Sequence, residues 1–138
     1  MRVFLDSNVL VSGIVYPGTE RAILLATFQG KHGFVISQDV EREVLDVARR
    51  KFARLRDEAE EVISLLRVEN VPRKAYKARL REFPGLRDPN DAHILAAAIV
   101  SRCDAIATGD RDLLALREVQ GVRIIRPTQA RRLMSSRR

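Results

Sequence analysis

The sequence predicts an α/β fold, a three-layer α/β/α sandwich with a mostly parallel central sheet. Short apolar runs typical of buried strands alternate along the chain with segments whose apolar residues recur at helical spacing. The chain has 138 residues, of which 46% are hydrophobic and 31% charged, and this is enough for one hydrophobic core. We therefore expect a single domain over residues 1–138, with a loose basic tail at about 135–138.

The expected strands are short apolar runs: Val3–Leu5, Phe34–Ile36, Ala105–Ala107 and Val122–Ile125. Helices are expected between them. Thr19 is expected to cap a helix over ERAILLATFQ, and Ser37 to cap a helix that runs toward Phe52. Helical spacing also marks Arg56–Leu66 and the alanine-rich Asp91–Val100, and Thr128 is expected to cap a short final helix. The least regular stretch runs from Val71 to Pro89.

The charge balance suggests a polyanionic partner. Lysine and arginine number 25 against 18 acidic residues, which gives a formal charge of +7. A well-solvated surface would explain the same charge, so this observation alone decides little. The single cysteine, Cys103, excludes an internal disulfide and a cysteine-rich zinc site, and it suits the cytoplasm. No apolar stretch is long enough to suggest a membrane span.

Four carboxylates fall where predicted strands end or the following helices begin. They are Asp6, Glu43, Asp91 and Asp110, with Asp112 two residues farther on. Taken singly, capping explains Asp6, Asp91 and Asp110 well, and Glu43 can reach solvent. Taken together, they lie where parallel α/β sheets gather functional groups.

Convergence of these acids would require cations. Two carboxylates about 5 Å apart repel by roughly 3 kcal/mol at an effective dielectric constant near 20. Hard divalent ions that prefer oxygen ligands, Mg²⁺ or Mn²⁺, are the natural partners. The pattern therefore favours a metal site that includes Asp6.

Four segments, in order, closely resemble the PIN-domain ribonucleases, and most strongly the VapC-like toxins of toxin–antitoxin modules. They are LDSNVLVSG, SQDVEREV, DPNDAHILAAA and ATGDRDLL. The resemblance extends from Arg2 to about Pro127, and the first and third segments are quite specific in combination. It implies a parallel α/β/α sandwich, three or four clustered acids, Mg²⁺ or Mn²⁺, and cleavage of single-stranded RNA.

Carried over by motif, the acids are Asp6, Glu43, Asp91 and Asp110. Asn8 and Thr108 match an asparagine and a threonine that support the ligands. Glu41 competes with Glu43, which we prefer for its offset of six residues from Ser37. Asp112 competes with Asp110 and could hold a metal-bound water.

One histidine and three arginines are also considered for roles in the structure or in RNA binding. His93 is expected to point away from Asp91 along its helix and to be structural. Arg87, Arg49 and Arg50 are candidates for phosphate contacts, although solvated helix faces explain them nearly as well. Aromatic residues make up only 5% of the chain, so an extended base-stacking platform is not expected.

The sequence thus predicts a Mg²⁺- or Mn²⁺-dependent endoribonuclease that acts on single-stranded RNA. It would be the toxin of a toxin–antitoxin pair, with a cognate antitoxin and a homodimer as possible partners. Two alternatives are a catalytically inert PIN-type RNA-binding protein and an aspartate-dependent phosphatase. The phosphatase is disfavoured because a second aspartate is usual two residues after the first, and here that position is Asn8.

Overall fold

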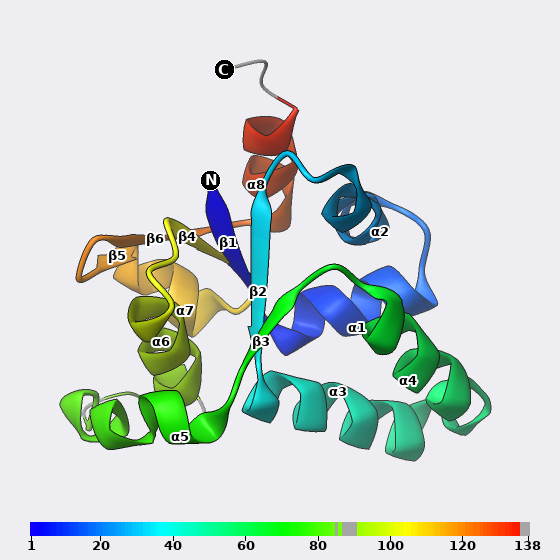
Figure 1. The fold of residues 1–138 in the computed structure, drawn as a ribbon, viewed down its shortest axis with the longest axis horizontal. Coiled ribbons are helices and arrows are strands. Elements are labelled where there is room, and N and C mark those ends of the chain that lie inside the picture. Colours follow the sequence, from blue (N-terminus) through cyan, green and yellow to red (C-terminus); the bar gives the residue numbers. More distant parts are fainter. Residues whose placement is uncertain (85, 87–90, 136–138) are drawn as a thin grey trace.

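The computed structural model describes residues 1–84, 86 and 91–135, and its centre is a sheet of six strands (Figure 1). The strand order is β3-β2-β1-β4-β6-β5, and all neighbours are parallel except β5 and β6. The predicted α/β fold with a mostly parallel sheet is confirmed. The strands are β1 (Arg2–Leu5), β2 (Gly33–Ser37), β3 (Glu69–Val71), β4 (Ala105–Ala107), β5 (Glu118–Val119) and β6 (Val122–Ile125).

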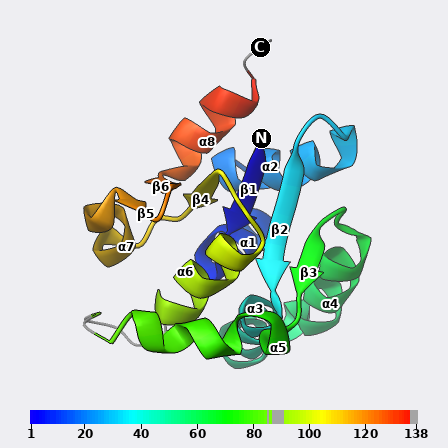
Figure 2. The same ribbon diagram turned by 60° about the vertical axis from the view of Figure 1, so that its left-hand side comes forward.

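Helices cover both faces of the sheet. Figures 1 and 2 show α1 and α2 on one side of the central strands and α6 on the other, while α8 packs against α2. The α-helices are α1 (Ser7–Val15), α2 (Thr19–Ala26), α3 (Gln38–Lys51), α4 (Arg56–Leu65), α5 (Arg73–Tyr76), α6 (Asp91–Val100), α7 (Arg111–Leu116) and α8 (Pro127–Met134). Three 3₁₀ turns join them: η1 (Thr27–Gln29), η2 (Ala53–Leu55) and η3 (Lys77–Glu82).

The core lies where β1 and α6 pack at the middle of the sheet. Val3, Phe4 and Leu5 of β1 are completely buried, as expected for a strand with a neighbour on each side and helices over both faces. In α6 every residue from Asp91 to Ala98 is buried. Its alanines have little side-chain bulk, so the helix can approach the sheet closely.

Of the three caps predicted for Thr19, Ser37 and Thr128, that of Ser37 is confirmed and the other two are wrong. The side chain of Ser37 accepts a hydrogen bond from the backbone N–H of Val40 and caps α3. Thr19 is instead the first residue of α2, because the chain turns at Gly18, whose φ of 144° is rarely adopted by other residues. The cap of α8 is Arg126 rather than Thr128, and Pro127 occupies the first helical position, where its fixed φ suits the start of a helix.

Among the described strands and α-helices, four were not predicted. These are α1, which the apolar run after Asp6 concealed, the two edge strands β3 and β5, and the single-turn helix α5 within the stretch expected to be irregular. The candidate Arg87 and the first residues of the segment DPNDAHILAAA, Asp88 to Asn90, lie outside the described residues. Within the described residues no single helix is long and apolar enough to span a membrane; only α1 together with the segment Thr19–Gln29, bent by 102°, reaches that length and composition.

Candidate functional site

The site forms at β1, where the strand order reverses: the chain adds β2 and β3 on one side of β1, and β4, β6 and β5 on the other. β1 pairs with β2 on one side and with β4 on the other, so the loops after β1 and β4 leave the same edge of the sheet next to each other. The backbone N–H of Asp6 donates to the carbonyl of Ala107 at 3.2 Å. This bond places Asp6 beside Thr108 and the loop that carries Asp110.

Three carboxylates, which we call the acid cluster, meet beside this edge: Asp91, Asp110 and Asp112. One oxygen from each lies within 4.8 Å of the others, and burial decreases from buried Asp91 to partly exposed Asp110 and exposed Asp112. Asp110 caps α7 by accepting from the backbone N–H of Asp112 at 2.8 Å, which keeps these two residues together. A donor set made only of carboxylate oxygens suits a hard divalent ion such as Mg²⁺ or Mn²⁺.

Asp6 lies next to the acid cluster and is only 5% exposed. Its Oδ2 accepts from the hydroxyl of Thr108 at 2.6 Å, and its Oδ1 accepts from the backbone N–H of Ser7 at 2.7 Å. Burial raises the pKa of Asp6; these two donors lower it, and the charges of Glu43 and Asp110 raise it further, so the net shift is upward. Asp6 is thus both the N-cap of α1 and a buried acid beside the cluster.

Thr108 connects the two strand ends. Its hydroxyl donates to Asp6 and accepts from the backbone N–H of Asp110 at 3.0 Å, and the residue is fully buried. One side chain therefore orients an acid after β1 and the backbone that carries an acid after β4. The role expected for Thr108, support of the acids, matches this position. Asn8 is exposed near the start of α1, and its side chain forms no hydrogen bond within the described part of the chain.

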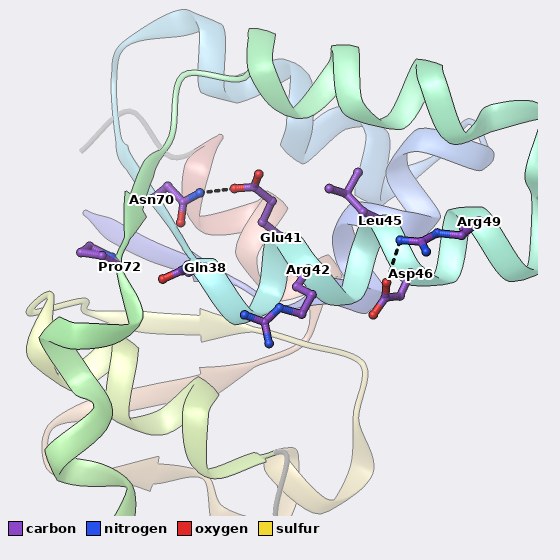
Figure 3. Close-up of a pocket in the computed structure, with 8 residues that line it drawn as sticks. All are labelled: Gln38, Glu41, Arg42, Leu45, Asp46, Arg49, Asn70 and Pro72. Carbon is purple, nitrogen blue, oxygen red and sulfur yellow. Dashed lines mark hydrogen bonds and ion pairs between the residues drawn. The ribbon is translucent and has the colours of Figure 1, made fainter.

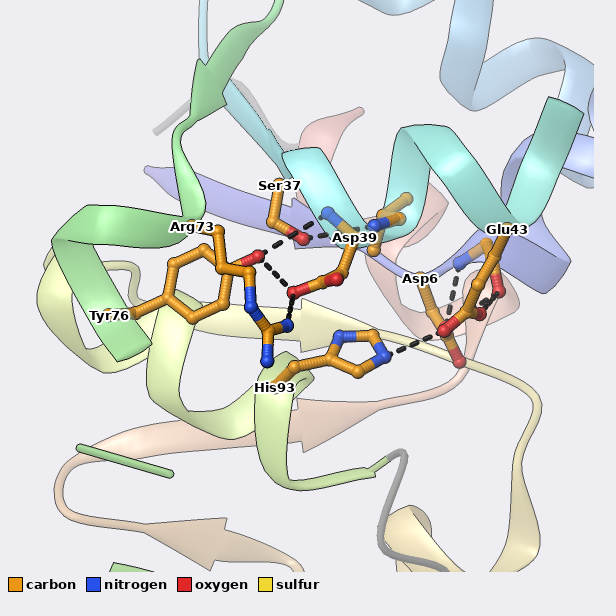
Figure 4. Close-up of polar contacts among 9 residues, drawn as sticks. Asp6, Ser37, Asp39, Glu43, Arg73, Tyr76 and His93 are labelled. Atoms are coloured by element: carbon orange, nitrogen blue, oxygen red, sulfur yellow. Dashed lines mark hydrogen bonds and ion pairs between the residues drawn. The ribbon is translucent and has the colours of Figure 1, made fainter. Parts of the chain in front are cut away.

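Glu43, not Glu41, reaches the site. The hydroxyl of Ser7 donates to Oε2 of Glu43 at 2.9 Å, and Nε2 of His93 lies 2.6 Å from Oε1 (Figure 4). Glu41 instead accepts from the side chain of Asn70 in β3, at a separate hollow on the other side of α3 (Figure 3).

His93 makes a contact that was not predicted. We expected it to point away from Asp91 and to be structural; it is only 8% exposed, and its ring contacts Glu43. The reason is tertiary: α6 and α3 both border the site, so the face of α6 that carries His93 meets α3. The spacing of residues within α6 does not contain this information.

A second polar group missed in the sequence lies beside His93 (Figure 4). Asp39 is 8% exposed and accepts from the hydroxyl of Tyr76 at 2.5 Å and from Arg73 at 2.7 Å. Burial raises the pKa of Asp39, but donation from Tyr76 and the positive charges of His93 and Arg73 outweigh it, so its pKa is lowered. These partners lie more than thirty residues away, and nothing in the local sequence indicates the contact.

Of the predicted basic contacts, the two that the structure describes lie at the end of α3, beyond Glu43. Arg49 and Arg50 are exposed in the last turn of α3, and Arg49 pairs with Asp46 at 3.4 Å. Arg49 is six residues beyond Glu43, roughly 9 Å along the helix axis. Arg42 lies closer, one residue before Glu43, and its side chain extends away from Asp46 and Arg49 (Figure 3).

Comparisons with known proteins agree with this arrangement. A family model described as PIN domain matches residues 2–112. A structure of VapBC2 from Rickettsia felis, bound to a DNA fragment from their promoter, is similar with a TM-score of 0.64 and 18% identity over 91% of this chain and 98% of that one. Mycobacterium tuberculosis VapC20, a sarcin–ricin loop cleaving toxin, is similar with a TM-score of 0.59 and 19% identity over 88% and 98%. No curated protein matches the sequence significantly. The match over most of the chain shows that it belongs to the PIN domain family.

Proposed function

We propose that this protein is a divalent-metal-dependent endoribonuclease that cleaves single-stranded RNA. The observation that carries the proposal is the acid cluster, in which carboxylate oxygens from α6, from the N-cap of α7 and from the first turn of α7 lie within 4.8 Å of one another. Three such charges would repel strongly without a cation. The acids of the cluster, together with Asp6, are the residues that would hold Mg²⁺ or Mn²⁺.

The chain's own residues would orient the acids rather than transfer protons. A bound divalent ion supplies an activated water and stabilises negative charge on the phosphate oxygens. Thr108 and Ser7 fix the rotamer of Asp6, and Ser7 and His93 hold the two oxygens of Glu43. With both oxygens held by protein donors, Glu43 is best suited to a place at the edge of the metal site. We assign Arg49, Arg50 and Arg87 to phosphate contacts because of their positive charge alone; Arg87 lies outside the described residues.

We further propose that the protein is the toxin of a toxin–antitoxin pair. Support comes from its similarity in fold to VapC20 and to a VapBC2 complex. A cognate antitoxin would be its partner, and a homodimer is a second proposed assembly. Since β6 pairs with β4 and α8 packs on α2, the residues after 112 are proposed to complete one domain over residues 1–138. Co-purification with the product of the neighbouring gene would test the antitoxin proposal.

Cleavage of a fluorescent single-stranded RNA tests the nuclease proposal. The wild type should cut the RNA with Mg²⁺ or Mn²⁺ and not with chelator. Asp91→Asn should reduce the rate at least about a hundredfold, while Asp57→Asn, at an exposed acid of α4, should leave it unchanged. Mn²⁺ binding, followed by electron paramagnetic resonance, should weaken in Asp91→Asn only. Equal rates and equal Mn²⁺ affinities in the two variants would refute the proposal.

A further inference from the structure

A recess of about 500 Å³ lies beside Glu43 and Asp39, which form part of its lining. Its lining comes from four segments: the first half of α3, the start of α5, η3 with the residues that follow it, and the beginning of α6. Glu43 and His93 belong to its lining, and through them the recess adjoins the site at Asp6 (Figure 4). Its volume is within the range of small-molecule sites, roughly 300–1,000 Å³, and exceeds what a single water needs.

One wall of the recess is apolar. Leu80 and Phe83 pack against the core with part of their surface and line the recess, where they are only partly buried. An aromatic ring and an aliphatic side chain together provide a surface on which a flat, weakly polar group can lie. The part of this surface that is not packed against the core faces the recess, close to Glu43.

Positive charge borders the same recess. Arg73 and Arg42 both line it. Arg73 is held by Asp39, whereas Arg42 is exposed and forms no ion pair with an acid among the described residues. Arg42 is therefore available to an anionic ligand. It directly precedes the metal-site candidate Glu43 on α3.

We propose that this recess binds one unstacked nucleobase of the RNA next to the cleaved phosphate, with the base against Phe83 and Leu80 and a neighbouring phosphate at Arg42. This inference rests on the proposed function and adds the means of substrate selection. Proteins commonly recognise single-stranded RNA by stacking splayed bases on aromatic side chains while cations hold the backbone. An apolar wall, an unpaired arginine and continuity with the acids supply these parts here. A nucleobase explains the arginine beside the apolar wall better than a purely apolar ligand does.

Binding of mononucleotides tests the recess without any cleavage. Nuclear magnetic resonance titrations would compare AMP, GMP, CMP and UMP with ribose 5-phosphate, which lacks a base, in buffer with Mg²⁺. At least one nucleotide should bind about tenfold more tightly than ribose 5-phosphate, the size expected for one stacked base. The resonances that shift should centre on Leu80, Phe83 and Ala92 of the wild type, a readout that needs no variant.

Three variants assign the contributions. Phe83→Leu keeps an apolar side chain and should reduce the advantage of the nucleotide to about threefold or less, without changing the affinity for ribose 5-phosphate. Arg42→Gln should weaken both ligands by the same factor. Arg54→Gln, at an exposed arginine of η2 outside the recess, is the matched control and should change neither.

The outcomes separate this inference from the proposed function. Equal affinity for nucleotides and ribose 5-phosphate, as expected if the recess receives a protein side chain, would overturn the nucleobase site. Shifts centred elsewhere, or an unchanged ratio in Phe83→Leu, would overturn it too. Base-dependent binding without RNA cleavage by the wild type would leave the recess standing and remove the nuclease proposal.

Discussion

Replacement of Asp110 by asparagine should stabilise the metal-free protein. Asparagine caps helices as well as aspartate does, so the bond from the backbone N–H of Asp112 can be kept while one charge is removed. At the 4.8 Å limit, each pair of charges in the acid cluster repels by about 3.5 kcal/mol at a dielectric constant of about 20. Because Asp110 and Asp112 are partly or fully exposed, solvent and salt screen most of this. We expect a gain of about 1–2 kcal/mol, or roughly 3–6 °C in melting temperature.

The assay is thermal unfolding of wild type and variant in chelator and in Mg²⁺. Mg²⁺ at ten times its dissociation constant should stabilise the wild type by about 1.4 kcal/mol and the variant by less. Glu61→Gln removes one charge from an exposed helical position and controls for the change in net charge. The reasoning is refuted if Asp110→Asn melts no higher than wild type in chelator and gains as much from Mg²⁺, which is the pattern of a residue that only caps α7.

Three further predictions concern single residues. Because the pKa of Asp6 is raised, the free energy of unfolding in chelator should fall as pH rises from the ordinary pKa of aspartate through the raised one. Urea titrations should show a shallower fall in Asp6→Asn, and an identical fall would contradict the assignment. Tyr76→Phe should cost about 1–3 kcal/mol, since it removes a donor to a buried carboxylate. The lowered pKa of Asp39 stabilises the protein above the ordinary pKa of aspartate, and this stabilisation is lost as pH falls through the lowered value. The loss of unfolding free energy in Tyr76→Phe should therefore become smaller in acid. A loss that does not depend on pH would argue against this. Gly13→Ala should destabilise by about 1–2 kcal/mol by calorimetry, because its Cβ would lie 2.6 Å from a side-chain carbon of buried Leu24; an unchanged melting temperature would show that the two helices can separate freely.

The local sequence predicted those helices and strands in which the apolar residues follow the pattern of burial. The strands β1, β2, β4 and β6 and the helices α3, α4 and α6 have apolar spacing that matches one buried face or a fully buried position. Helix α1 was missed because it is apolar on most sides and follows β1 with only Asp6 between them. Edge strand β3 exposes two of its three residues, so only its pairing with β2 identifies it.

For the site, too, local sequence predicted some features and not others. Asp6, Asp91, Asp110 and Asp112 could be placed at strand and helix ends, and the structure brings them to one edge of the sheet. The contact between His93 and Glu43 joins residues 50 positions apart on two helices, and no local pattern encodes it. The same is true of the hydrogen bonds to Asp39, which depend on where α5 crosses the start of α3.

The hydroxyl bond between Thr108 and Asp6 has a consequence for the order in which the protein is made. These residues are separated by 102 positions, and β4 must pair with β1 before the bond can form. At translation rates of roughly 5–20 residues per second, the interval between synthesis of the two residues is about 5–20 s. During that interval the nascent chain carries Asp6 without the acids that follow β4. The proposed metal site is therefore incomplete until the residues after β4 have been synthesised and β4 has paired with β1.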